Sequence, residues 1–134
     1  MTEFEYPERA KELLTTRNVG VLTTLNADGT PHTTPVWIDL DGEDIVMSTT
    51  TRRKKARNLE RDPRASVLVI DPDNPVGYFS FNGNVVLEID PDNSMLERLS
   101  VKFLGEAYPE EPHNVRVTIR LRPERMIAQF DRAT

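Results

Sequence analysis

The sequence predicts a mainly β protein, an antiparallel barrel of six or seven strands with three short helices packed outside it. Three observations support this fold class. Segments rich in β-branched residues recur along the chain, separated by turn signals such as NADG at Asn26–Gly29. The first three segments follow one another too closely for helical crossovers, so they are antiparallel. At 134 residues, the chain is long enough for one core, and we expect a single domain spanning residues 1–134.

The N-terminal third predicts one helix and three strands. A helix begins at Pro7, which is tolerated in a first turn, and ends near Arg17. Val19–Leu25 and Pro31–Leu40 flank the NADG turn and are expected to pair as a hairpin. After a second turn, Asp44–Thr50 (DIVMSTT) forms the third strand.

The middle of the chain predicts one helix followed by two strands. Arg52–Asp62 is expected to be helical and to end before Pro63, because the residue preceding proline avoids the α region. Arg64–Ile70 is a continuous apolar stretch typical of a buried strand. Val76–Ile89 is a long strand in which Gly83 indicates a bulge or a bend.

The C-terminal third predicts a helix and then strands to the end of the chain. Asp90 is the expected N-cap of the helix, Pro91 its first residue and Gly105 the residue that closes it. Val115–Leu121 alternates apolar and polar residues, and Arg125–Phe130 continues as a strand after a short interruption.

Positive charge is concentrated in one segment of an otherwise acidic chain. Arg52–Arg61 carries six cations and Glu60, a local charge of +5, although the whole chain has a formal net charge of −5. The remainder therefore carries −10 and would repel a long polyanion, so nucleic-acid binding is not expected. A small anion that reaches only the basic segment is the favoured ligand, and a solvated helix face is the alternative.

Several residue types and segments are missing from the sequence, which excludes some functions. Cysteine is absent, so disulfides, thiolate metal sites and a cysteine nucleophile are excluded. With only His32 and His113, we expect no metal site. The first residues carry acids and no apolar core, unlike a secretory signal. No apolar run approaches the roughly 20 residues that span a bilayer, so we expect a cytoplasmic protein that is not associated with a membrane.

Hydroxyl groups at the end of one strand meet the cations at the start of the next helix. The first amides of a helix lack intrahelical partners and attract phosphate. Cations at this end oppose the helix dipole, and a locally unfavourable choice of this kind often indicates function. The residues that could bind an anion here are Ser48, Thr49, Thr50, Thr51, Arg53, Lys54, Lys55 and Arg57.

Four segments taken together resemble a known superfamily. They are GVLTTLNADGTPHTTPVW, IVMSTTTRRKKARNLERDPRASVLV, GYFSFNGNVVLE and VRVTIRLRPERM. They resemble the pyridoxamine 5′-phosphate oxidase-like split β-barrel superfamily, most of all the flavin/deazaflavin oxidoreductases that use coenzyme F420. The most specific piece is RxKxRNLxRDPRxSVLV, at Arg53–Val69. The resemblance covers Val19 to Met126 and implies an FMN-binding-like split β-barrel of the antiparallel Greek-key type.

The resemblance also implies a function and a set of cofactor-binding residues. Proteins of this kind are homodimers that hold the cofactor in a groove between subunits and transfer hydride to or from a small organic substrate. By position in the motifs, Ser48 and Thr49 would lie near the phosphate. Three cations at the helix start would bind the phosphate and, in deazaflavin enzymes, part of the ring and tail: Arg53, Lys55 and Arg57. Lys54 matches a phosphate-binding position of the flavin members.

Four further positions follow from the resemblance. The backbone of Pro35, Val36 and Trp37 would run along the edge of the cofactor ring, and Tyr78 would lie near the pocket or the dimer seam. The resemblance identifies no catalytic side chain. The C-terminal motif of true pyridoxamine phosphate oxidases has no counterpart here, which disfavours a role in vitamin B6 metabolism. FMN in place of F420, and a non-catalytic protein that sequesters the cofactor, remain as alternatives.

Overall fold

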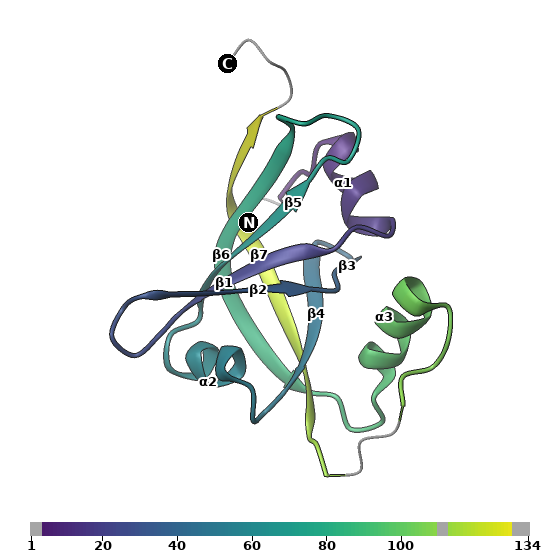
Figure 1. The fold of residues 1–134 in the computed structure, drawn as a ribbon. Coiled ribbons are helices and arrows are strands. Elements are labelled where there is room, and N and C mark those ends of the chain that lie inside the picture. Colours follow the sequence, from purple (N-terminus) through teal and green to yellow (C-terminus); the bar gives the residue numbers. More distant parts are fainter. Residues whose placement is uncertain (1–3, 110–112, 130–134) are drawn as a thin grey trace.

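The computed structural model describes residues 4–109 and 113–129, which form seven strands and three helices (Figure 1). In chain order the elements are α1 (Glu8–Thr15), β1 (Gly20–Leu25), β2 (Pro31–Val36), β3 (Asp39–Asp41), β4 (Asp44–Thr50), α2 (Lys54–Arg61), β5 (Arg64–Ile70), β6 (Tyr78–Ile89), α3 (Ser94–Leu104) and β7 (Arg116–Gln129). No helix among these elements is long and apolar enough to cross a bilayer.

The seven strands form one antiparallel sheet, in the order β2-β1-β5-β6-β7-β4-β3. This architecture confirms the predicted mainly β split barrel. The long strands β6 and β7 dominate it (Figure 1), and their register shifts at Asn82/Gly83. The bulge predicted at Gly83 is therefore confirmed. A Cβ atom at this position would collide with the carbonyl oxygen of Arg122, so the bulge requires glycine.

The two edge strands, β2 and β3, are consecutive in the chain and are joined only by Trp37 and Ile38. The prediction of one strand over Pro31–Leu40 was therefore wrong. Pairing with β1 ends at Gly20, opposite Val36, and the fully buried Ile38 then packs directly over Gly20. The chain bends because Ile38 gains more from burial in the core than from continuing along the edge.

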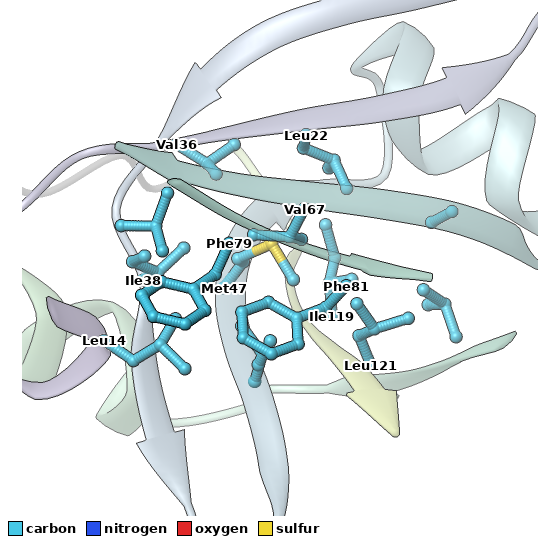
Figure 2. Packing of buried hydrophobic residues seen from close by; sticks show 14 of the residues in the cluster. Leu14, Leu22, Val36, Ile38, Met47, Val67, Phe79, Phe81, Ile119 and Leu121 are labelled. Carbon is cyan, nitrogen blue, oxygen red and sulfur yellow. The ribbon is translucent and has the colours of Figure 1, made fainter. Parts of the chain in front are cut away.

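The barrel interior is filled by apolar side chains from every long strand (Figure 2). Phe79 and Phe81 stack at its centre, with ring centroids 6.4 Å apart, against Met47, Val67 and Ile119. A second, smaller apolar cluster lies outside the barrel, where α3 packs on β4. It consists of Val46, Met95 and Leu99, with Trp37 against them.

The helices follow the predictions in location and differ at their ends. α1 begins at Glu8, one residue later than predicted, with Pro7 as its N-cap, and it ends at Thr15, shortly before the predicted end near Arg17. α2 begins at Lys54, two residues later than predicted, because Arg53 is in an extended conformation. For α3, the predicted N-cap at Asp90 and first position at Pro91 were wrong. The N-cap is Asn93, in the left-handed region with φ 59°.

Asp90 lies outside the helix but still accepts hydrogen bonds from backbone amides in the first turn of α3. Its buried carboxylate accepts hydrogen bonds from the amides of Met95 (3.0 Å) and Leu96 (3.3 Å). Gly105 closes the helix with a φ of 77°, as predicted. The two final strand segments form one strand, β7, and Phe130 lies outside the described residues.

Candidate functional site

A cavity of about 350 Å³ lies beside the end of β4, between α3, the β2–β3 crossover and the start of α2. We refer to it as the β4 pocket. Figure 1 shows α3 beside β4, and α2 as the element that follows β4 in the chain. Its lining residues are Val19, Pro35, Val36, Trp37, Ser48, Thr49, Arg53, Lys55, Leu96, Leu99, Tyr108 and Arg116. One wall is polar and cationic, and the other is apolar and aromatic.

The polar wall begins with hydroxyl groups at the end of β4. Met47 is fully buried in the barrel interior, so the next residue, Ser48, faces the opposite side of the strand and lines the pocket. The Ser48 Oγ atom is buried and has no hydrogen-bond partner among the described residues. A buried hydroxyl without a partner is destabilising by about 1–3 kcal/mol, and a bound ligand with a polar group would remove that penalty.

Cations from two elements complete the polar wall. Arg53 and Lys55 come from the start of α2, and Arg116 from the start of β7. The described lining residues include no carboxylate. Burial, and secondly the nearby Arg53 guanidinium, lower the pKa of Lys55. Both causes make the charged form of Lys55 less favourable, and a bound anion would offset them.

The backbone at the start of α2 also favours an anion. The first intrahelical hydrogen bonds are donated by the amides of Ala56 and Arg57 to the carbonyl oxygen of Arg53. The amides of Lys54 and Lys55 precede these bonds, and the Arg53 side chain does not cap the helix. The positive end of the α2 dipole therefore adds to the cationic wall of the pocket.

The opposite wall is aromatic and is held in place by ring contacts. Trp37 stacks on Phe103, with centroids 5.6 Å apart and an interplanar angle of 5°. Tyr108 packs edge-on against Trp37 at 6.2 Å, and the Arg116 guanidinium carbon lies 5.1 Å from the Tyr108 ring centroid. Leu99 continues this wall along α3. The pocket thus suits a flat molecule with an anionic end.

Seven of the ten residues predicted from sequence line the β4 pocket: Pro35, Val36, Trp37, Ser48, Thr49, Arg53 and Lys55. Lys54 and Arg57 instead line a separate groove, together with Arg61 and the β1–β2 turn. Tyr78 begins β6, opposite Ile70 and Gln129, and lines neither cavity.

The prediction missed the residues that α3 and the following segment contribute. Leu96 and Leu99 lie on an apolar helix face, which is typical of core packing and gives no sign of a pocket. Tyr108 lies in a loop, and Arg116 is the first residue of an alternating strand. The sequence pattern also did not predict that Trp37 stacks on Phe103 of α3.

The chemistry available to the pocket is binding and orientation. Its lining residues include no histidine and no carboxylate that could form an acid–base pair. In residues 4–109 and 113–129, no group of three or more His, Asp or Glu side chains could hold a metal ion. Cationic donors, an unsatisfied hydroxyl and an aromatic wall remain, as expected of a site whose reactive group belongs to a bound molecule.

Comparison with known proteins identifies the family. The family model described as pyridoxamine 5′-phosphate oxidase matches residues 6–130. A solved structure of an F420 reductase has 34% sequence identity and a TM-score of 0.82, with 91% of this chain and 98% of that chain covered. A conserved hypothetical protein from Mycobacterium tuberculosis has 27% identity and a TM-score of 0.74, with 94% and 85% covered.

A more distant structure shares the fold. General Stress Protein 26 from Bacillus anthracis has 24% identity and a TM-score of 0.65, with 87% of this chain and 88% of that chain covered. The family match spans nearly all of the sequence, including every strand that borders the β4 pocket. The chain belongs to the pyridoxamine 5′-phosphate oxidase family, as its motifs predicted.

Proposed function

We propose that this protein is an oxidoreductase that binds the deazaflavin coenzyme F420 in the β4 pocket and transfers hydride to or from a small organic substrate. One observation carries the proposal. The unpartnered hydroxyl of Ser48 and the cations Arg53 and Lys55 face an aromatic wall across one cavity. The F420 reductase that is 34% identical over 91% of this chain supports the choice of cofactor.

The residues of the polar wall would hold the charged end of the cofactor. Ser48 and Thr49 supply hydroxyl groups, while Arg53 and Lys55 supply charge-assisted hydrogen bonds to phosphate. The segment from Pro35 to Trp37 would lie along the edge of the ring. When bound, the deazaflavin supplies the hydride chemistry, and the protein supplies orientation and electrostatic stabilisation.

The apolar wall would exclude water from the reacting face. Trp37 and Tyr108 shield this side of the pocket, and Leu96 and Leu99 extend the shield along α3. Water exclusion strengthens the bonds from the cationic wall, because charges interact more strongly in a medium of low dielectric constant. No protein nucleophile is required, which is consistent with a lining that contains neither cysteine nor histidine.

The proposed enzyme is a homodimer, and an apolar row on the outer face of the sheet supports this state. Register places Pro35, Val21, Leu68, Ser80 and Ile127 opposite one another across five neighbouring strands. All except the serine are apolar, and Ile127 is 50% exposed. The row ends at Pro35, a lining residue of the β4 pocket, so a second copy on this face would adjoin the pocket.

The cofactor assignment is tested by titrating purified protein with F420 and with FMN while following ligand absorbance or fluorescence. We expect tighter binding of F420 and turnover with a screen of enones, quinones and nitro compounds. Tight binding of FMN without affinity for F420 would establish the alternative, an FMN-dependent oxidoreductase of the same fold. Tight binding of F420 without turnover would establish a sequestering protein.

The dimer is tested by sedimentation equilibrium of the wild type and of Leu68→Glu. We expect the wild type to be a dimer, and the variant to be a monomer with weakened F420 binding, because a carboxylate would be buried at the centre of the interface. Lys11→Glu, on the exposed face of α1, is the control and should remain dimeric. A monomeric wild type at micromolar concentration would refute a dimer-interface groove.

A further inference from the structure

Lys102 of α3 is almost buried and connects three separate parts of the chain. Its side chain is only 13% exposed. Its ammonium group donates to the carbonyl oxygens of Leu14, at the end of α1 (2.9 Å), and Ile38, in the β2–β3 crossover (2.6 Å). It also lies 3.6 Å from the Asp39 carboxylate. These contacts attach α3 to the crossover that joins the two edges of the barrel.

The next residue of α3 attaches to the preceding residue of the crossover. Phe103 stacks on Trp37 with parallel rings, and the Lys102 ammonium lies 5.0 Å from the Phe103 ring centroid. Two consecutive residues of the helix therefore clamp two consecutive residues of the crossover, Trp37 and Ile38. Trp37, a member of this clamp, also lines the β4 pocket as part of its aromatic wall.

Apart from this clamp, α3 has a modest attachment to the barrel. Its apolar contact with β4 is the small cluster formed by Val46, Met95 and Leu99. Arg98 adds bonds to the Asp39 carboxylate (3.2 Å) and the carbonyl oxygen of Leu40, but both contacts are on β3, beyond Trp37. The partly buried Lys102 is the charged contact that attaches α3 to Ile38, next to the pocket residue Trp37.

We propose that Lys102 is a positioning residue: by binding the Ile38 carbonyl oxygen it holds Trp37 against Phe103 and so sets the aromatic wall of the β4 pocket. Lys102 is not among the residues that line the pocket and acts through Trp37. Its effect on ligand affinity rests on the proposed function, whereas its effect on Trp37 does not.

The experiment uses Trp37 as its own reporter, because it is the only tryptophan in the chain. Intrinsic fluorescence and acrylamide quenching are measured for the wild type, Lys102→Met, Lys102→Arg and the control Lys11→Met, an exposed lysine of α1. We expect red-shifted emission and stronger quenching in Lys102→Met only. Arginine should restore both signals, because its guanidinium can donate to both carbonyl oxygens.

The affinity for F420 is measured on the same proteins. We expect Lys102→Met to weaken binding by about ten-fold, since a small displacement of a wall that orients the ligand is sufficient, and Lys102→Arg to restore it. If Lys102→Met does not accumulate as folded protein, Lys102→Leu, which also removes the donor, replaces it with the same expectation.

Two results would overturn the inference. One is a folded Lys102 variant in which emission and quenching of Trp37 match the wild type. The other is a loosened Trp37 with unchanged F420 affinity. A wild-type protein that does not bind F420, combined with the expected fluorescence changes, would refute the proposed cofactor and still support the positioning of Trp37 by Lys102.

Discussion

The barrel interior and the β4 pocket share strand β4. They differ in whether the side chains of that strand find packing and hydrogen-bond partners within the protein. Met47 of β4 is fully buried among apolar neighbours, whereas the next residue, Ser48, places a buried hydroxyl in the pocket without a hydrogen-bond partner among the described residues. The interior is complete without any other molecule. The pocket, where the Ser48 hydroxyl has no partner among the described residues and no lining carboxylate accompanies Arg53 and Lys55, is not. Substitutions in the interior should therefore change stability, and substitutions in the pocket should change ligand affinity.

The largest expected effect tests the interior. Phe81→Ala removes a ring that is 0% exposed and should lower the free energy of unfolding by about 3–5 kcal/mol. Val86→Ala, at a side chain that is 61% exposed, should change it by less than about 0.5 kcal/mol. Urea denaturation measures both. Equal losses for the two variants would contradict the assignment of Phe81 to the core.

A smaller effect is expected at Asp90, at the start of α3. Its carboxylate caps α3, the helix that carries the apolar side of the pocket, so Asp90→Ala should cost about 1–3 kcal/mol of stability and also weaken ligand binding. The exposed Asp92→Ala is the control. Thermal unfolding and ligand titration on the same samples check this. A loss of stability with unchanged ligand affinity would show that ligand binding does not depend on the capping of α3 by Asp90.

Local sequence patterns predicted the strands of the interior well, because the apolar residues of a strand indicate which of its faces is buried. The predicted bounds of β4 and β5, Asp44–Thr50 and Arg64–Ile70, are those observed. The bend at Trp37 was missed because its cause, the packing of Ile38 over Gly20, involves a residue 18 positions earlier in the chain. Alternation along Pro31–Leu40 carries no information about that contact.

The lining residues of the pocket were predicted only where they lie close together in the sequence. The hydroxyl–cation junction from Ser48 to Lys55 was found because its residues are adjacent in sequence. Tyr108 and Arg116 were missed because only the tertiary fold brings them to the end of β4. The sequence also grouped Lys54 and Arg57 with the other cations of this segment. It could not show that these two residues line a different groove.

Adjacent lysines of α2 give a sharp test of the pocket. Lys55→Ala should weaken F420 binding by about ten-fold or more, the loss expected for a charge-assisted hydrogen bond, with little change in stability. Lys54→Ala, in the separate groove, should weaken it by less than about three-fold, because an exposed charge is screened by solvent. Equal effects would show that the ligand extends around the start of α2.

The smallest expected effect is a dependence on pH. Burial lowers the pKa of Lys55, so the ammonium loses its proton at a lower pH than an ordinary lysine. Affinity for an anionic ligand should fall as the pH rises through this lowered pKa. In the free protein, the charged form is destabilising below that pKa, and stability should rise slightly as the proton is lost. Lys55→Arg keeps its charge, so its affinity should stay constant where that of the wild type declines.

The strand order has a consequence for how this protein is made in the cell. The hairpins β1–β2 and β3–β4 are local in sequence and occupy opposite edges of the sheet, and they are joined across it only when β7 pairs with both β6 and β4. Of the seven described strands, β7 is synthesised after the other six. Until β7 has been synthesised, the nascent chain exposes the unpaired edges of β4 and β6, so barrel closure is a late event that depends on non-local pairing.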